Sequence, residues 1–510
     1  MNSLNRSTIG DIITRSAHRA PTATALHFED RTWTYAELDD AATRVAAALL
    51  DLGLRKGDRV AAFGKNSDAY ILLWLGVAKA GLIHVPVNFA LGGHELAYIL
   101  RQSGARAVFA DESLLPEVEA SGATPEFTGS LRGGIPDRDV LAWGIATTPA
   151  PEISVEISDD DLVQILYTAG TTSDPKGAML THRALAHHYA SACMALDQSA
   201  SDRVLHALPL YHSAQLHVFA MPYLMLGAEN WVLEVPAPLR LLDAIAEHGI
   251  NSFFAAPTVW VALAGLIEKD PGRVGKLEKA YYGASIMPTP VLQRLRAALP
   301  AIGFYNCFGQ SEMGPLCTVL RPEEHDDRPA SAGRATPFVD MRVVDEDMNS
   351  VAPGEVGEVV YRSPQVCLGY WDKPAETAEA FTGGWFHSGD LARIDGEGFI
   401  TVVDRKKDVI NAGGIVVSSR EVEEAFFTHP AVHEVAVIPL PDPKRIEAVT
   451  AIVVLEPGAE TDEATLRNHA REELAEFKVP RHVYFIDALP KNSAGKVQKR
   501  VLREQFAPKA

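Results

Sequence analysis

Small and hydroxyl-bearing residues surround a single lysine between positions 167 and 177, and this stretch is well suited to binding phosphate. Small residues let backbone N–H groups approach an anion, hydroxyl groups donate further hydrogen bonds, and Lys176 supplies a positive charge. An apolar run, 162–166, precedes the stretch, and Thr181, a favourable helix N-cap, follows it. We therefore predict a buried strand, a phosphate-binding loop and a helix in succession. The order of a Walker A loop, Gly-x-x-x-x-Gly-Lys-Ser/Thr, is absent.

A second stretch that could do chemistry is 309–313, where a hydroxyl and a carboxylate are adjacent. Ser311 and Glu312 offer the oxygen ligands that Mg²⁺ prefers. A serine hydrolase would need Gly-x-Ser-x-Gly at this point, but Met313 occupies the position of the last glycine. A glutamate considered alone is more often a solvated surface group, so assigning magnesium to Glu312 depends on the motif in which it lies.

Several separated segments of the chain together resemble the motifs of the adenylate-forming superfamily. This superfamily contains the acyl-CoA synthetases, aryl-CoA ligases, luciferases and the adenylation domains of peptide synthetases. The matching segments, spread over nearly the whole chain, are 167–177, 209–213, 283–285, 306–312, 385–390 and 490–496.

The resemblance implies a site for ATP and AMP with three parts: a phosphate loop, the walls of an adenine pocket, and a group that contacts ribose and the α-phosphate. The corresponding residues are Thr168, Gly170, Thr171, Thr172 and Lys176; then Gly283, Ala284, Ser285, Asn306, Cys307, Phe308, Gly309, Gln310 and Ser311; and finally Asp390, Arg405 and Lys496. Glu312 matches the glutamate that holds Mg²⁺.

The catalytic residues that the resemblance implies are Lys496, Glu312, Thr171 and His212. Lys496 matches a lysine that bridges the substrate carboxylate and the α-phosphate. Because adenylation brings two anions together, a lysine, with a reference pKa of about 10.4, can neutralise their approach. His212 matches a histidine beside the acyl pocket, whose expected walls are His212, Ala214, Phe254, Ala256, Gly283 and Gly309.

The resemblance also implies a moving C-terminal domain. Asp404 matches the pivot residue, and Gly413-Gly414 match a loop that forms the coenzyme A tunnel after adenylation. The chain departs from the family pattern at this loop, where the aliphatic Ile415-Val416 follow the glycines. It departs again in the phosphate loop, where Ala169 replaces a usual serine and Ser173 a usual glycine.

The elements that must position these residues alternate between strand and helix spacing over 34–110 and again over 204–299. Such alternation predicts parallel sheets with helices on both faces. The expected details are a capping box from Thr34 to Glu37, a strand at 82–85 that Pro86 closes, a strand at 105–110 and an irregular connection over 112–151.

Beyond Ser331, short β-rich runs separated by glycines predict a small antiparallel barrel. We therefore expect an α/β fold with a large N-terminal domain, 1–403, that contains two α/β subdomains and the small β-barrel. A mobile C-terminal α+β domain, 404–510, would follow, with its hinge at Asp404 and a helix at 419–427.

Composition limits the partners. The chain has 510 residues, too many for one core, and a formal net charge of −19, which argues against nucleic acid and against an anionic membrane surface. The four cysteines show neither zinc-ligand nor disulfide spacing. The N-terminus lacks the apolar core of a signal peptide, and no apolar window is long enough to span a membrane. We expect a cytoplasmic protein without a transmembrane segment; a homodimer is left open.

The function that the resemblance implies is an acyl-CoA synthetase that uses ATP, Mg²⁺ and coenzyme A. A medium- or long-chain or bulky hydrophobic carboxylic acid would give acyl-AMP, and coenzyme A would then displace AMP. Two alternatives stay open. One is an adenylating enzyme that passes acyl-AMP to another acceptor, as Ile415-Val416 suggest; the other is a non-catalytic acyl or nucleotide sensor.

Overall fold

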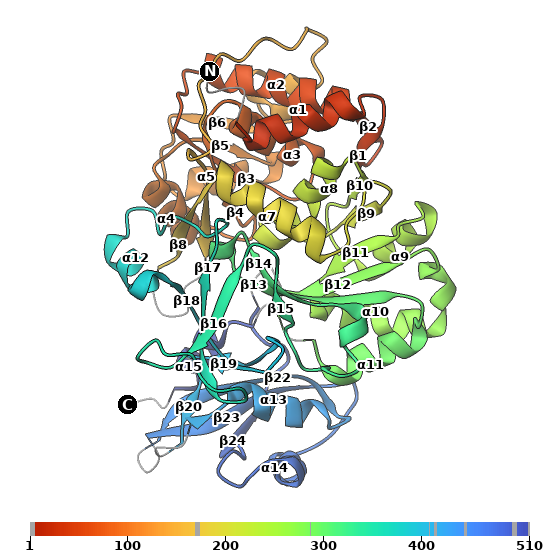
Figure 1. The fold of residues 1–510 in the computed structure, drawn as a ribbon, viewed down its shortest axis with the longest axis vertical. Coiled ribbons are helices and arrows are strands. Elements are labelled where there is room, and N and C mark those ends of the chain that lie inside the picture. Colours follow the sequence, from red (N-terminus) through yellow and green to blue (C-terminus); the bar gives the residue numbers. More distant parts are fainter. Residues whose placement is uncertain are drawn as a thin grey trace.

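The computed structural model describes residues 6–168, 174–285, 287–406, 408–412, 416–442, 446–491 and 497–507, with the side chain of Val416 left out. Over these residues the chain forms a large α/β body, and the smaller C-terminal α+β unit lies at one end of it (Figure 1). The boundary at residue 404 stays a prediction.

The first part of the body is a six-stranded sheet in the order β6-β5-β3-β4-β7-β8, parallel except for β8. Its strands are β3 (Arg59–Phe63), β4 (Ile83–Val87), β5 (Ala105–Ala110), β6 (Phe127–Ser130), β7 (Leu162–Thr168) and β8 (Lys176–Thr181). The helices of this part are α1 (Ile9–Arg19), α2 (Tyr35–Asp51), α3 (Asp68–Lys79), α4 (Gly93–Ser103), α5 (Leu115–Ala120) and α6 (Val140–Gly144).

The second part is a nine-stranded sheet in the order β15-β14-β13-β12-β11-β9-β10-β1-β2. Its strands are β1 (Thr24–Phe28), β2 (Arg31–Thr34), β9 (Arg203–His206), β10 (Glu229–Val232), β11 (Ser252–Ala255), β12 (Lys279–Gly283), β13 (Gly303–Gly309), β14 (Leu316–Leu320) and β15 (Arg334–Ala335). The helices here are α7 (His182–Ala195), the π-helix η4 (Ala214–Ala220), α8 (Met221–Leu226), α9 (Pro238–Glu247), α10 (Pro257–Lys269) and α11 (Thr289–Ala298). Both α/β subdomains are thus confirmed.

The third part is a four-stranded antiparallel sheet in the order β16-β17-β18-β19, with the short helix α12 (Pro374–Ala380) beside it. Its strands are β16 (Asp340–Val344), β17 (Val356–Arg362), β18 (Phe386–Ile394) and β19 (Ile400–Arg405). The pairings of the described residues do not close this sheet into the small barrel that the sequence predicts.

The C-terminal unit has the expected α+β composition. A three-stranded sheet, β22-β23-β24, is built from β22 (Val432–Asp442), β23 (Ile446–Leu455) and β24 (His482–Phe485). The remaining elements are β20 (Ile410–Asn411), β21 (Val416–Val417), α13 (Ser419–Phe427), α14 (Glu463–Glu473) and α15 (Lys499–Phe506).

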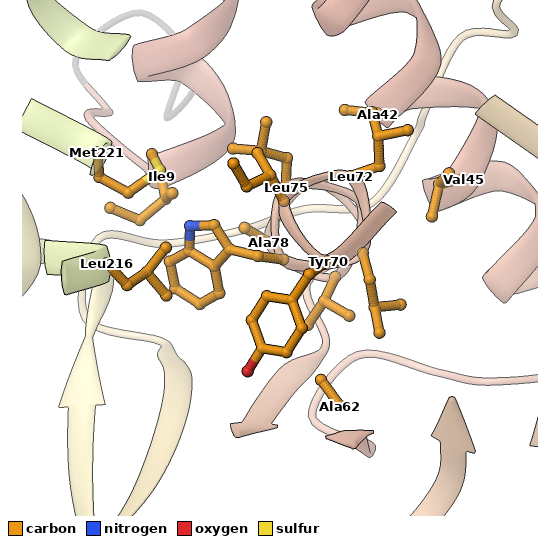
Figure 2. Close-up of a cluster of buried hydrophobic side chains, with 14 of the residues drawn as sticks. Ile9, Ala42, Val45, Ala62, Tyr70, Leu72, Leu75, Ala78, Leu216 and Met221 are labelled. Carbon is orange, nitrogen blue, oxygen red and sulfur yellow. The ribbon is translucent and has the colours of Figure 1, made fainter. Parts of the chain in front are cut away.

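Helix α3 shows why the body is stable at its centre. Its residues from Asp68 to Ala78 are all buried, since neighbours cover it on every side. Ser67 caps the helix by accepting from the Tyr70 N–H. Figure 2 shows Leu72 and Leu75 of α3 among Val45 of α2, Ile9 of α1 and Met221 of α8, so this one helix joins the two α/β subdomains.

Two details of the first sheet differ from the sequence-based expectation. Strand β4 continues through Pro86 to Val87, and both residues stay in register with β3, opposite Ala62 and Phe63. The segment 112–151, expected to be irregular, contains α5, α6 and the edge strand β6. These elements are too short for their periodicity to be seen in the sequence.

Candidate functional site

The predicted site residues gather where strands of the two large sheets end. Thr168 is the last residue of β7, Gly283 ends β12, and Gly309 ends β13. The carboxyl ends of parallel strands at the junction of two α/β units are a usual place for ligands. The arrangement therefore brings together segments that are more than a hundred residues apart in the chain.

The phosphate loop has a different setting from the one expected. Strand β8 lies between the loop and helix α7, and it pairs antiparallel with β7, so the loop connects the strands of a hairpin. Thr181, which does cap α7, pairs with Leu162 at the opposite end of that hairpin from Thr168. The N-terminus of α7 therefore lies at the far end of the hairpin from Thr168, and the expected succession of strand, loop and helix is interrupted by β8.

Glu312 lies directly against the start of the phosphate loop. The Thr168 hydroxyl donates to Glu312 Oε1 over 3.4 Å, and the Tyr370 hydroxyl donates to the same oxygen over 3.0 Å. Lys176 places its ammonium group 5.1 Å from the centre of the Tyr370 ring. Burial and the neighbouring Glu312 carboxylate raise the pKa of Tyr370, so it remains a donor. A carboxylate, a hydroxyl and a cation thus meet at one point.

Tyr370 contacts the site but is not among the site residues predicted from the sequence. Its segment is held against β8 by an antiparallel β-bridge between Tyr370 and Ala178. Beside this bridge, the Met179 N–H donates to the Gly369 carbonyl. The only signal in the sequence was an aromatic pair, Tyr370-Trp371, directly after a glycine.

The expected adenine walls approach the neighbouring backbone closely. A Cβ atom on Gly283 would lie 2.1 Å from the Cys307 carbonyl oxygen, and one on Gly309 would lie 2.0 Å from the Pro315 carbonyl oxygen. Ala284 has a φ of 66°, a left-handed conformation that is strained for alanine. Strain of this kind accumulates at ligand sites, which agrees with the predicted role of this turn.

Two side-chain amides at the end of β13, those of Asn306 and Gln310, differ in their hydrogen bonding. The Asn306 amide donates to the Ser331 carbonyl over 3.0 Å. Among the described residues, the buried Nε2 of Gln310 has no hydrogen-bond partner. A buried amide without a partner is costly, so a polar ligand atom at this position would stabilise the site.

His212 is linked to the same region through its neighbour. The hydroxyl oxygens of Ser213 and Ser311 are 3.0 Å apart, which ties the segment before η4 to the segment that carries Glu312. Ala214 is the first residue of η4 and is partly exposed. Phe254, in contrast, is 2% exposed and stacks on Phe219, and Ala256 is the buried cap of α10.

Two residues that are expected to contact ribose and phosphate, Asp390 and Arg405, form an ion pair. Asp390 and Arg405 face each other in the β18–β19 register, and the Arg405 Nε lies 2.8 Å from Asp390 Oδ1. Cys317 packs against the expected adenine wall, with its Sγ 3.1 Å from a Cβ built on Gly309, and burial raises the pKa of its thiol.

Asp404, the expected pivot, contacts the C-terminal unit. Its Oδ2 accepts from the Ser419 N–H over 2.6 Å, at the start of α13. Lys499 of α15 reaches the same point, donating to the Ser419 hydroxyl over 2.7 Å and pairing with Glu423 over 2.7 Å. Strand β19 is therefore tied to both α13 and α15 in this arrangement.

Six predicted site residues lie outside the described part of the chain: Gly170, Thr171 and Thr172 of the phosphate loop, Gly413 and Gly414, and Lys496. The ends of the segment that carries Lys496 are described. Lys491 and Val497 form an antiparallel β-bridge, and the Gln498 N–H donates to the Pro490 carbonyl over 2.8 Å.

We expect Gly309→Ala to destabilise the protein by about 1–3 kcal/mol, because its Cβ would overlap the Pro315 carbonyl and force the backbone to move. The matched control is Gly265→Ala in α10, where nothing lies within 4 Å of the new Cβ. That substitution should be neutral or stabilising, since alanine favours a helix. Thermal unfolding of both variants measures the difference, and an unchanged midpoint for Gly309→Ala would contradict the close approach.

Comparison with known proteins gives a consistent result. The family model "AMP-binding enzyme" matches residues 13–371, and the model "AMP-binding enzyme C-terminal domain" matches residues 421–496. The chain is 34% identical over 498 residues to a feruloyl-CoA synthase of Amycolatopsis sp, covering 98% of this chain and 99% of that one. It is 34% identical over 504 residues to the fatty acid–[acyl-carrier-protein] ligase ScoC of Streptomyces coeruleorubidus, covering 96% and 95%.

Among solved structures, the fold is similar to that of the anthranilate CoA ligase AuaEII in complex with anthranoyl-AMP. The TM-score is 0.91 at 27% identity, with 98% of each chain covered. In the part of the chain that the structure describes, no helix is long and apolar enough to cross a bilayer.

Proposed function

Since the chain belongs to the AMP-binding enzymes and is an AMP-forming acid–CoA ligase, we propose that the site described above performs both half-reactions on a hydrophobic carboxylic acid. The observation that supports this most strongly is the contact of 3.4 Å between Thr168 and Glu312. In this contact Thr168, at the start of the expected phosphate loop, lies beside the carboxylate that the resemblance assigns to magnesium.

In the first half-reaction, one carboxylate oxygen attacks the α-phosphorus of ATP, and pyrophosphate leaves as the bond between the α-phosphorus and the bridging oxygen breaks. Two anions must approach each other, so cations are needed on both sides. Lys176, held over Tyr370, is positioned for the phosphate chain. Lys496 is proposed to bridge the carboxylate and the α-phosphate.

The residues present fit a magnesium ion. The donors beside Glu312 are the oxygens of Thr168 and Tyr370, and hard cations prefer oxygen. The described residues contain no cluster of three or more His, Cys, Asp or Glu that could form a complete cage. Mg²⁺ is usually held by one or two carboxylates together with substrate phosphates, and when bound it would neutralise phosphate charge.

The residues also fit an adenosine group. Gly283 and Gly309 let neighbouring backbone segments approach closely at the ends of β12 and β13, where the resemblance expects the adenine walls. The Gln310 Nε2, which has no hydrogen-bond partner among the described residues, offers a hydrogen bond, and Asp390 offers two carboxylate oxygens for a diol. Asp390 is held in place by Arg405.

In the second half-reaction, the thiol of coenzyme A attacks the acyl carbon, and AMP leaves with one of the original carboxylate oxygens. We propose that rotation at Asp404 withdraws Lys496 and brings Gly413-Gly414 to the site. Because Asp404 accepts a hydrogen bond from Ser419 in this arrangement, the rotation must break or rearrange that contact.

Acid-dependent exchange of labelled pyrophosphate into ATP tests the first half-reaction. A panel of hydrophobic acids should give exchange that requires Mg²⁺ and does not require coenzyme A. A protein that binds ATP without exchange for any acid would be a sensor, and the proposal would fail.

A second candidate function is the transfer of acyl-AMP to an acceptor other than coenzyme A. It is favoured by the likeness to ScoC, an acyl-carrier-protein ligase, and by Ile415-Val416 after the two glycines. Supplying synthetic acyl-AMP distinguishes the two functions: a coenzyme A ligase converts it to acyl-CoA, whereas a carrier-protein ligase transfers it only to the carrier protein.

A further inference from the structure

The residues expected to surround the acyl group form two layers on one face of the nine-stranded sheet. The upper layer, at the carboxyl ends of β12 and β13, pairs Gly283 with Cys307. Two residues earlier along each strand, the register pairs Phe254 with Tyr281 and Tyr281 with Tyr305. The upper layer is therefore made of small residues, and the lower one of aromatic rings.

The two layers lie on the same side of the sheet. Phe254, Tyr281 and Tyr305 pack in one buried cluster with Cys307. Their sequence neighbours Phe253 and Tyr282 belong to the cluster on the opposite face, as the alternation of side chains in a strand requires. The aromatic layer thus lies directly beneath Gly283 and Cys307.

Four rings form what we call the aromatic floor: Phe219, Phe254, Tyr281 and Tyr305. Phe219 from η4 stacks on Phe254 with ring centres 4.4 Å apart, and it lies 5.1 Å from Tyr281. Tyr281 and Tyr305 are 5.0 Å apart. Together the four rings form a continuous surface beneath the small residues.

The hydroxyl groups of the aromatic floor are already satisfied. Tyr281 donates to the Leu196 carbonyl over 2.9 Å, and Tyr305 donates to Asp197 over 2.9 Å. Since these partners lie in the segment after α7, the floor offers no spare hydroxyl donor to a ligand. It offers only carbon surfaces, which suit an apolar or aromatic group.

Two of the residues expected around the acyl group are more exposed than the floor, although Gly283 and Cys307 above the floor are themselves buried. Ala214 and Gly309 are partly exposed, whereas Phe254 is 2% and Phe219 is 1% exposed. Two residues of a strand span roughly 7 Å, so the floor lies about one six-membered ring below Gly283.

We propose that the aromatic floor restricts this enzyme to compact hydrophobic acids, with a single ring or a short branched chain, and excludes long straight-chain fatty acids. This rests on the proposed function, because it takes the acyl group to bind between Ala214, Gly283 and Gly309. It narrows the broader class of medium- or long-chain or bulky acids that the sequence suggests. Phe254, which the sequence analysis expects in a wall of the acyl pocket, is then the residue that limits the depth of that pocket.

The experiment is acid-dependent pyrophosphate exchange by the wild-type enzyme with a series of acids. The series includes benzoic acid, a substituted cinnamic acid, 3-methylbutanoic acid, and straight-chain acids from butanoic to hexadecanoic. We expect kcat/KM to be at least about tenfold lower for acids that reach past the floor than for the best compact acid. Equal or higher kcat/KM for tetradecanoic or hexadecanoic acid would overturn the inference and leave the ligase function intact. If none of the acids supported pyrophosphate exchange, the proposed function would be overturned as well.

A pair of variants tests the floor itself. Phe254→Ala removes a ring from the floor and should raise the kcat/KM of straight-chain acids by about tenfold or more relative to benzoic acid. Phe253→Ala removes an equally buried ring from the opposite face of the same strand and should leave the chain-length profile unchanged. A shift in both variants, or in neither, would contradict the assignment of Phe254; if neither variant folds, the wild-type series decides.

Discussion

Replacing Lys496 with alanine is expected to lower acid-dependent pyrophosphate exchange by about a hundredfold or more. This is the scale on which enzymes lose rate when a group that stabilises transition-state charge is removed. The carboxylate and the α-phosphate are both anionic, and Lys176, the cation described beside Tyr370, remains in the variant. The loss therefore reports the contribution of the second cation alone.

The same variant separates the two half-reactions. If Lys496 acts only in adenylation, Lys496→Ala should still convert supplied acyl-AMP and coenzyme A to acyl-CoA at a rate near that of the wild type. Lys491→Ala is the matched control, since Lys491 lies at the other end of the same segment and pairs with Glu434. Equal loss of both half-reactions in Lys496→Ala would refute the division of labour.

Acidification is expected to destabilise the protein strongly between pH 6.5 and pH 4, because several histidines are buried in the neutral form. Burial lowers the pKa of His84 and His188 to about 3, and that of His182 and His206 to about 4. The unfolded chain, with a histidine pKa near 6.5, then binds more protons than the folded one below that pH. Stability is therefore complete above about pH 6.5 and is lost as the pH falls toward the folded values.

The size of this effect follows from the pKa differences. At pH 5 each of these histidines lowers the free energy of unfolding by about 2 kcal/mol. Together the four approach the whole stability of a typical domain. Thermal unfolding at pH 7.5 and pH 5 measures the loss. His188→Leu should reduce the difference between the two midpoints, whereas substitution of the exposed His18 by leucine should not. An unchanged pH dependence in His188→Leu would contradict a neutral, buried His188.

Local signals in the sequence predicted several elements to the residue. The strand at 105–110 and the helix at 419–427 occur as β5 and α13, because a clear apolar run and an N-cap define them. The capping box from Thr34 to Glu37 forms with both of its hydrogen bonds. These features depend on interactions within a few residues.

Features that depend on distant partners could not be predicted. The sequence of β8 contains a glycine and an alanine, and only its pairing with β7 makes it a strand, so the phosphate loop was placed before a helix. Phe254 was expected in a pocket wall, but its depth depends on the register of three strands and on Phe219 from η4. Tyr370 reaches Glu312 from a segment 58 residues away.

The central claim is that a carboxylate of the substrate attacks the α-phosphate of ATP in the site between Thr168, Glu312 and Lys496. The most direct measurement uses an acid labelled with ¹⁸O in both carboxylate oxygens, incubated with the enzyme, Mg-ATP and coenzyme A, with mass spectrometry of the nucleotide and of pyrophosphate. The account predicts one ¹⁸O atom in the phosphate group of AMP and none in pyrophosphate. Label in pyrophosphate or free phosphate, or ADP as the nucleotide product, would contradict it.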